Sequence, residues 1–519
     1  MIIDMKKYLT ILAVLPALLL ACNKPDTPHE DPIVPPAGIS VDQSTIDVAV
    51  KGARYVFEVT SPARPVVTSD AAWVTTRDRV YDKYKIKFWL YTSSNRTYED
   101  RVATLTVSCE GATPVTFTVK QPKKTIIPEP ELPANDAVAM AKKISLGWNM
   151  GNEMEAHDNG MPAEDAWTGV LCTQATFDGV AAKGITAVRI PVSWIKLIGE
   201  APDYTLDADR LARLKEIVGY AHNAGLVTIF NLHHDGADSN WWLNIKNGAD
   251  NDAILDEIEK VWTQLAEAFK EEGDWLMFES FNEIQDGNWG NSGEYTTADG
   301  KKRMNDVLNG WNQKFVDAVR ATGGNNSTRW LGVPGYCASP EFTLNDGFKL
   351  PSDPANHVMV GIHDYTPYDF CQTAKDSQWG NTREIKDGDE TYDEDYMKKI
   401  FHEFYEKYVK NNVPVYLGEF GCANHKPGEG RRYQLYYLEY LSKCAATYGM
   451  GGFIWDNGAT GTGKEIYGII DHGTGEYLDA EFGAQIIAVC LKGFTDDSEG
   501  YTLRYIHDNA PVPDPKEEE

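Results

Sequence analysis

Apart from its N-terminus, the 519-residue sequence lacks long hydrophobic runs, internal repeats and paired cysteine motifs. No stretch after residue 21 approaches the roughly 18 uninterrupted apolar residues of a transmembrane helix. Seven of the eight cysteines follow Cys22, and none form a Cys-x-x-Cys pair, which argues against a disulfide framework and against a zinc site. We expect most of these cysteines to be small buried apolar residues.

Positive charge is also scarce. The chain has 49 Lys+Arg against 77 Asp+Glu, a net charge of −28. Such a surface repels phosphate backbones, so nucleic acid is a poor candidate partner. With 42% hydrophobic and 11% aromatic residues, the chain can build a large core and is neither disordered nor fibrous. Its length predicts about two to four domains.

The one long apolar run marks an export signal. Lys6 and Lys7 precede the segment Tyr8–Ala21, which is too short for an ordinary membrane span and is followed by Cys22. This arrangement resembles a bacterial lipoprotein signal, in which cleavage before the cysteine is followed by its acylation. A plain secretory signal with a chance cysteine is the alternative. The resemblance implies an exported protein held to a membrane by lipid on Cys22, and we expect the outer membrane and its outward face.

Composition divides the rest of the chain. The signal covers 1–21, and a tether at 22–38 carries five prolines. A strand-rich module follows at 39–122, then a proline-containing hinge at 123–134 and a large domain at 135–498. The acidic end, 499–519, is expected to fray.

The module at 39–122 is predicted to be an all-β sandwich. Short β-branched or aromatic runs recur at the spacing typical of such folds. Ala72-Trp73-Val74, the run 101–107 and the closing Val119-Lys120-Gln121 resemble an immunoglobulin-like module of the BACON type. Such a module could bind carbohydrate or act as a rigid spacer, and the residues do not separate these two interpretations.

The large domain alternates short apolar strands with helical periodicity over about 360 residues, which predicts a (β/α)8 TIM barrel and an α/β fold class. The strands are expected at 144–150, 185–192, 226–232, 275–281, 329–333, 357–362, 413–417 and 452–455. The helices are expected at 206–223, 253–272, 301–322, 393–411, 431–448 and 480–491.

In a TIM barrel the catalytic groups follow the carboxyl ends of the strands. Glu283 ends the fourth predicted strand and Glu419 ends the seventh. Two such carboxyls are what a retaining glycosidase needs, one as nucleophile and one as acid and then base. Arg189 is expected to keep Glu419 ionised, and the charge of Glu419 is expected to raise the pKa of Glu283. Asn282 can hydrogen-bond the 2-hydroxyl of a sugar.

Seven motifs occur in the order found in glycoside hydrolase family 5, the cellulase and mannanase family, which the sequence resembles. They are Gly147–Asn152, Val188–Trp194, Leu232-His233-His234, Phe281-Asn282-Glu283, His363-Asp364-Tyr365, Gly418–Gly421 and Trp455. The resemblance implies that Glu283 is the acid/base and Glu419 the nucleophile. It further implies substrate-binding or supporting roles for Arg189, His233, His234, Asn282, His363, Tyr365, Trp455, Asn149 and Asn152.

The sequence departs from the family at two places near the non-reducing-end subsites. Glu153 stands where relatives commonly have Thr, and 167–173 lacks the usual Trp-Gly pattern. A metal on His233 and His234 is disfavoured because adjacent strand residues point to opposite faces. We expect neither metal nor cofactor. Four further tryptophans in predicted loops are expected either to stack on sugars or to pack the loops: Trp241, Trp242, Trp289 and Trp379.

The predicted reaction is retaining, endo-acting hydrolysis of β-1,4-glucosidic bonds in a plant β-glucan: cellulose-type, mixed-linkage or xyloglucan. The run His363–Phe370 resembles the endoglucanase and xyloglucanase branch more than the mannanase branch. The alternative substrate is mannan or glucomannan. An alternative of another class is a non-catalytic surface lipoprotein that binds glycan. The expected partner is polysaccharide, and we expect a monomer.

Overall fold

The computed structural model describes residues 34–236, 241–383 and 392–514. The predicted signal, Cys22 and the tether as far as residue 33 lie outside the described residues. The chain forms two compact units that divide between Ile126 and Ile127. No described helix has the length and apolar character needed to cross a membrane.

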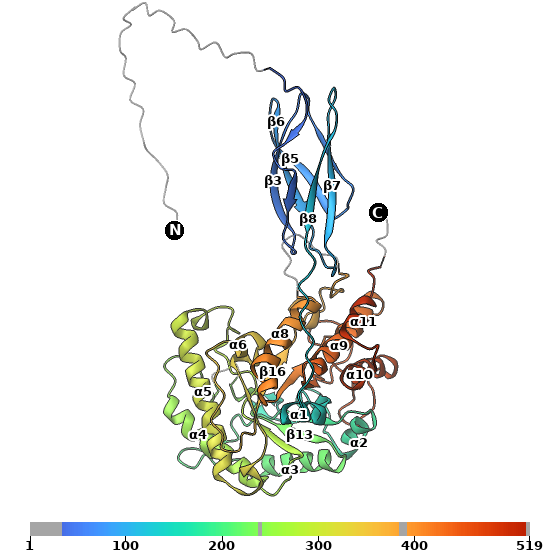
Figure 1. Ribbon diagram of the computed structural model, residues 1–519. Coiled ribbons are helices and arrows are strands. Elements are labelled where there is room, and N and C mark those ends of the chain that lie inside the picture. Colours follow the sequence, from blue (N-terminus) through green and yellow to red (C-terminus); the bar gives the residue numbers. More distant parts are fainter. Residues whose placement is uncertain (1–33, 237–240, 384–391, 515–519) are drawn as a thin grey trace, which may run out of the picture. The chain divides into compact units, whose positions relative to one another are not determined.

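The N-terminal unit is a sandwich of two four-stranded sheets (Figure 1), as predicted. One sheet has the order β1-β3-β6-β5 and the other β2-β8-β7-β4. Inward residues such as Phe57, Phe88 and Phe117 form its core, and their neighbours along each strand face outward. The strands are β1 (Ser40–Val41), β2 (Thr45–Asp47), β3 (Ala53–Thr60), β4 (Val66–Ser69), β5 (Val74–Asp82), β6 (Lys85–Thr92), β7 (Arg101–Ser108) and β8 (Val115–Gln121).

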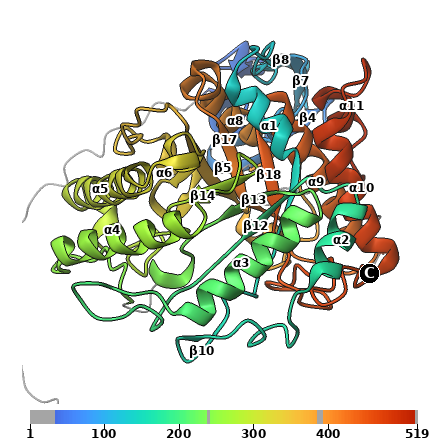
Figure 2. The same ribbon diagram turned by 90° about the horizontal axis from the view of Figure 1, so that it is seen from below.

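The C-terminal unit is a closed barrel of eight parallel strands surrounded by helices (Figure 2), which confirms the predicted fold. Every residue of seven strands is buried, because helices cover the outside and side chains fill the inside. In barrel order the strands are β9 (Leu146–Asn149), β12 (Ala187–Ile190), β13 (Val227–Phe230), β14 (Leu276–Glu279), β15 (Leu331–Pro334), β16 (Val358–Asp364), β17 (Val415–Phe420) and β18 (Gly451–Ile454).

The six predicted helices are present, close to their expected bounds. They are α3 (Ala208–Asn223), α4 (Asn251–Ala268), α5 (Ala298–Ala321), α8 (Glu394–Lys407), α9 (Glu429–Thr447) and α10 (Ala480–Thr495). Shorter helices were not predicted: α1 (Asp136–Ile144), α2 (Gln174–Ala182), α6 (Pro340–Leu344), α7 (Tyr368–Cys371) and α11 (Leu503–Asp508). A two-stranded ribbon, β10 (His157–Asp158) with β11 (Met161–Pro162), also lies outside the prediction.

Two boundary predictions need correction. The second half of the expected hinge belongs to the barrel unit, where Tyr448 donates a hydrogen bond to the carbonyl of Pro128 (2.9 Å) and Lys398 pairs with Glu129 (2.8 Å). The acidic end does not fray as a whole. Residues Leu503 and Ile506 of α11 are buried in the barrel core, because apolar side chains there recur at helical spacing.

Candidate active site

Three polar side chains meet at the carboxyl end of the barrel. Glu283 follows β14, His363 is near the end of β16, and Glu419 is near the end of β17. One oxygen of each carboxyl group and a ring nitrogen of His363 lie within 4.8 Å of one another. The barrel therefore brings together the two glutamates that the sequence singled out.

A register shift between β16 and β17 places these side chains. Ile362 pairs with Leu417, but His363 pairs with Glu419, so Gly418 is an extra residue in β17. Such irregularities re-aim a side chain beside a site. A Cβ at Gly418 would lie 3.0 Å from Nε2 of His363, so only glycine leaves room for the imidazole.

Arg189, fully buried on β12, links the groups beneath the carboxyl pair. Its Nη1 donates to Glu419 (3.0 Å) and to Oδ1 of Asn149 (2.9 Å). Its Nη2 donates to Oδ1 of Asn282 (2.8 Å), and its Nε donates to Glu279 (2.7 Å). Burial alone would lower the pKa of the guanidinium, but Glu279 and Glu419 raise it above its ordinary value. Arg189 is thus a fixed cation shared by two carboxylates.

Glu279 is a buried member of this network that the sequence analysis missed. Its side chain is 1% exposed, and it ends β14 on the barrel interior. The signal that could have found it is a lone acidic residue within the apolar run 276–281, since a buried charge requires a partner.

Asn149 does not line the cleft, which corrects its predicted substrate-binding role. It is fully buried, and its Nδ2 donates to the carbonyls of Gly418 (2.9 Å) and Phe453 (3.1 Å). Because its Oδ1 accepts from Arg189, the amide of Asn149 is fully used in joining β9 to β12, β17 and β18. Asn282 differs, because Arg189 occupies only its Oδ1 and its side chain lines the cleft.

Glu419 accepts one further hydrogen bond, from the hydroxyl of Tyr365 (2.9 Å). Arg189 and Tyr365 thus lie where the resemblance placed the two groups that hold the nucleophile. Both oxygens of Glu419 are engaged, which fixes the orientation of its carboxylate.

Burial raises the pKa of Glu283 to about 7; the charge of Arg189 opposes this shift, and that of Glu279 adds to it. The predicted cause was the charge of Glu419, so the cause is corrected to burial, with Glu279 as the acidic neighbour. Nδ1 of His363 lies 2.7 Å from Oε1 of Glu283. Burial lowers the pKa of His363 to about 4, so a neutral imidazole contacts a carboxyl group that is half protonated near neutral pH.

A cleft of about 270 Å³ opens beside Glu283. Two of its tryptophans are well exposed, Trp167 at 42% and Trp289 at 49%. Trp379, in contrast, is buried against tyrosines of α9, and Trp242 donates to Asp235 (2.8 Å), so these two pack the protein. The cleft is lined by His157, Trp167, His233, His234, Trp241, Asn282, Glu283, Gln285 and Trp289.

His233 and His234 both line this cleft, contrary to the expectation that they face opposite sides. Strand β13 ends at Phe230, so the alternation of a strand no longer holds at these residues. Burial lowers the pKa of His234 to about 4 and that of His233 well below its ordinary value. The ring of His233 is parallel to that of half-buried Trp455, with centroids 6.0 Å apart.

Glu153, the departure from the family pattern, belongs to a buried charge cluster behind the cleft. Nδ1 of His472 lies 3.0 Å from Glu153, and Nε2 lies 3.4 Å from Asp456. All three side chains are essentially fully buried. The indole of Trp148 donates to Asp456 (2.9 Å), and Asn152 contacts the carbonyl of Asn457 (3.4 Å). The cluster joins the loops that follow β9 and β18.

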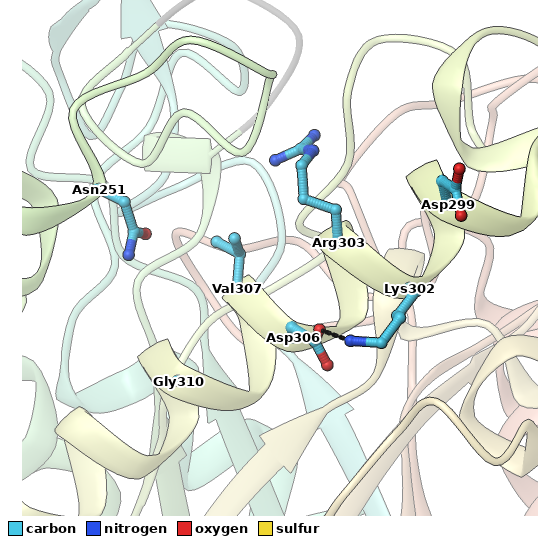
Figure 3. A pocket seen from close by; sticks show the side chains of 7 residues that line it. All are labelled: Asn251, Asp299, Lys302, Arg303, Asp306, Val307 and Gly310. Atoms are coloured by element: carbon cyan, nitrogen blue, oxygen red, sulfur yellow. Dashed lines mark hydrogen bonds and ion pairs between the residues drawn. The ribbon is translucent and has the colours of Figure 1, made fainter.

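A larger hollow, of about 380 Å³, lies at α5 (Figure 3) and shares no lining residue with the cleft beside Glu283. Three of its four charged side chains have partners, because Arg303 pairs with Glu294 and Lys302 with Asp306; the fourth, Asp299, is exposed. The Oδ1 of Asn251 accepts from the indole of Trp311 (2.7 Å). Paired surface charges without a buried, converging polar group do not make a catalytic site.

A parallel barrel with two close carboxyl groups at its strand ends, one of raised pKa, defines the glycoside hydrolase class of site. The family model for cellulase, glycosyl hydrolase family 5, matches residues 149–461, more than half of the chain. The chain therefore belongs to glycosyl hydrolase family 5, and it is an endoglucanase-type or xyloglucanase-type hydrolase of β-glucans. The BACON model matches residues 64–122.

Endoglucanase A of Paenibacillus barcinonensis is 36% identical over 342 residues, covering 63% of this chain and 83% of that protein. A xyloglucan-specific endo-beta-1,4-glucanase of Bacteroides ovatus is 27% identical over 515 residues, 95% of this chain and 97% of that protein. A solved broad specificity endoglucanase of Bacteroides salanitronis is 44% identical with a TM-score of 0.66, covering 69% of this chain and 95% of that one.

Proposed function

We propose that the protein is a retaining endo-β-1,4-glucanase in which Glu419 is the nucleophile and Glu283 the acid/base. The observation that carries the proposal is the approach of the two carboxyl groups to within 4.8 Å. Retaining enzymes separate them by about 5–5.5 Å, whereas inverting enzymes leave about 6.5–9.5 Å for a water molecule.

The contacts support a different role for each glutamate. Glu419, held by Arg189 and Tyr365, attacks the anomeric carbon while Glu283 gives its proton to the departing glycosidic oxygen. In the second step the Glu283 carboxylate removes a proton from water, and the water oxygen attacks the anomeric carbon and releases Glu419. A pKa of about 7 suits a group that must act first as acid and then as base.

The substrate is proposed to be a neutral β-glucan chain: cellulose-type, mixed-linkage or xyloglucan. Exposed indoles beside the carboxyl pair, Trp167 and Trp289, offer flat apolar faces to sugar rings. The full-length likeness to an enzyme named as xyloglucan-specific and the likeness to a broad specificity endoglucanase favour glucans over mannans.

Initial rates on carboxymethylcellulose, mixed-linkage glucan, xyloglucan, glucomannan and mannan test this assignment. We expect reducing sugar from at least one glucan, with early β-anomer seen by NMR, and no release by the Glu419→Ala variant. An early α-anomer contradicts retention, and a preference for pure mannan moves the assignment to the mannanase alternative. If the wild type releases nothing from the whole panel, the non-catalytic alternative replaces the enzyme.

We also propose that lipid on Cys22 holds the exported protein at the outer membrane, facing outward. The support is the sequence pattern Leu19–Cys22 after a short apolar run. Labelling of growing cells with a clickable fatty acid should mark the wild type and not the Cys22→Ala variant. Protease added to intact cells should remove the protein if it faces outward.

A further inference from the structure

The two units carry opposite net charge. Residues 34–126 hold 13 Lys+Arg and 9 Asp+Glu, a net charge of +4, whereas residues 127–519 hold 33 and 64, a net charge of −31. A cationic module is thus joined to a strongly acidic enzyme.

The cations gather on the outward face of the sheet β1-β3-β6-β5. On β6, Trp89 and Lys87 alternate with core residues and point outward. In the neighbouring strand β5, Arg77 pairs in register with Trp89, and Arg79 lies at a register shift. Arg54 comes from β3, on the other side of β6. We call these five residues the arginine face.

Two of these arginines cover the tryptophan. The guanidinium carbon of Arg54 lies 4.0 Å from the ring centroid of Trp89, and that of Arg79 lies 4.5 Å away. An indole covered in this way offers no platform to a neutral sugar. Stacking on the indole instead fixes the orientation of the two guanidinium groups and leaves their N–H edges accessible to a ligand. Two parallel N–H groups can then donate to the two oxygens of a planar anion such as a carboxylate.

These cations have no carboxylate partner. Arg54, Arg77, Arg79 and Lys87 are exposed, and none forms an ion pair with another residue of the part of the chain that the structure describes. The acidic residues on the same face are Asp42, Glu58 and Asp82. Glu58 lies opposite Lys87 in the register, but its carboxylate pairs with Lys85 (3.2 Å). In a chain of 77 acidic residues, four unpaired cations on one sheet face are available for an external anion.

We propose that the arginine face binds an acidic polysaccharide through the carboxylates of its uronic acid units. Extended strands present the cations along a surface that a linear chain can follow, and carboxylates match the guanidinium edges. A membrane surface fits less well. Among the side chains of this face that the structure describes, the one large apolar group that is mostly exposed is Val80 (54%). A single valine offers little apolar surface to insert among lipids. The proposal does not rest on the reaction at the barrel.

Affinity electrophoresis of the full chain tests the proposal. The background variant Glu419→Gln is used so that no gel polysaccharide is cut. We expect the protein to be retarded in gels containing polygalacturonate and the retardation to disappear at high salt. In hydroxyethylcellulose, the parent and variants of the arginine face should have the same mobility. The chain carries −28 overall, so its retardation by a polyanion would report a local cationic site and not bulk attraction.

Variants locate the site. Arg54→Ser/Arg77→Ser/Arg79→Ser should abolish the retardation, whereas Arg→Lys at the same positions should keep part of it. The control Lys51→Ser/Lys120→Ser/Lys123→Ser removes equal charge away from the arginine face and should be retarded like the parent. Near-ultraviolet circular dichroism checks that the variant with three arginines replaced by serine is folded.

Three results would overturn the proposal. One is a parent protein that migrates freely in polygalacturonate and in glucuronoxylan. Another is a lysine control that loses as much retardation as the variant with three arginines replaced by serine. The third is sedimentation with phosphatidylglycerol vesicles without retardation by either polysaccharide, which would assign the face to a membrane surface.

Discussion

Nε of Arg189 lies 2.7 Å from Oε2 of Glu279, closer than Nη1 of Arg189 lies to Glu419 (3.0 Å). Arg189, which holds Glu419, is therefore shared with a second buried carboxylate that does not reach the cleft. A shared cation offsets less of the charge of Glu419 than a dedicated one does. Glu279 also raises the pKa of Glu283, so it influences both reacting groups.

Replacing Glu279 by Gln should move the alkaline limb of the kcat/KM profile to lower pH. The variant lacks the negative charge that raises the pKa of Glu283, and that glutamate must be protonated for the first step. The profile on a soluble β-glucan measures the shift. Glu403→Gln, which removes a carboxylate on the surface of α8, should leave the limb in place. A profile identical to the wild type would show that Glu279 serves folding alone.

For the wild type, kcat/KM should fall as pH rises through about 7, where Glu283 loses its proton. An aryl cellobioside with a strongly acidic phenol needs no protonation to leave. With that substrate the glycosylation step of Glu283→Ala should persist and should lose the alkaline limb. Stopped-flow release of the phenol measures this step, and a limb that survives in Glu283→Ala would assign it to another group.

His363→Asn should reduce kcat by roughly 10²-fold or more, because a misplaced catalytic group costs about that much. The imidazole is the hydrogen-bond partner of Glu283 at 2.7 Å and also lies 3.6 Å from Glu419. Its pKa of about 4 keeps it neutral, so the loss should be the same from pH 5 to pH 8. A loss confined to acidic pH would instead indicate that a charged imidazole takes part.

Glu153→Gln should lower the free energy of unfolding by about 3–5 kcal/mol, since it leaves a buried imidazolium with one partner. Burial would lower the pKa of His472, but Asp456 and Glu153 raise it to about 10. A folded-state pKa above the unfolded value of about 6.5 stabilises the protein fully below pH 6.5. That contribution is lost as pH rises toward 10. Chemical denaturation at several pH values measures it.

The control for this cluster is Glu476→Gln, which removes an exposed carboxylate nearby in the sequence and should change stability little. In Glu153→Gln the alkaline loss of stability should begin at lower pH than in the wild type. Equal stability of wild type and Glu153→Gln from pH 6 to pH 9 would contradict a charged His472.

Trp289→Ala and Trp167→Ala should each lower kcat/KM on a polymeric glucan by up to about tenfold, because stacking and burial against a sugar ring are lost. Aryl cellobioside, which occupies fewer subsites, should show a smaller change. Tyr505→Ala removes an aromatic side chain that is 51% exposed on α11, outside the cleft, and should be neutral. A uniform effect on both substrates would place these indoles in support of the catalytic groups.

Much of the fold follows from local patterns. Each barrel strand is an apolar run between helical segments, and the polar residues at its end indicated where Glu283, His363 and Glu419 would meet. Short helices such as α1 and α2 escaped prediction because nine residues carry little periodicity. Strand β5 escaped it as well, because its outward face is charged and its register is interrupted.

The supporting residues of the site were harder to predict, for a physical reason. Glu279, Asn149 and His472 act through partners that are distant in the chain. The apolar run around Glu279 indicates that it is buried, but no local pattern identifies its partner or shows that Asn149 and His472 are buried. Asn149 belongs to a family motif, yet its side-chain amide donates to the backbone carbonyls of Gly418 and Phe453. The raised pKa of Glu283 likewise depends on burial, which only the closed barrel provides.

Pairing of β9 with both β12 and β18 closes the barrel, and Asn149 and Asp456 lie at that seam. Asn149 on β9 and Phe453 on β18 are 304 residues apart in the sequence. The site therefore assembles only after the last strand, β18, has paired with β9. A chain that stops before β18 holds Arg189, Glu283 and Glu419 but cannot close the barrel around them. Loss of the segment from β18 onward should therefore abolish activity although Arg189, Glu283 and Glu419 are all still present.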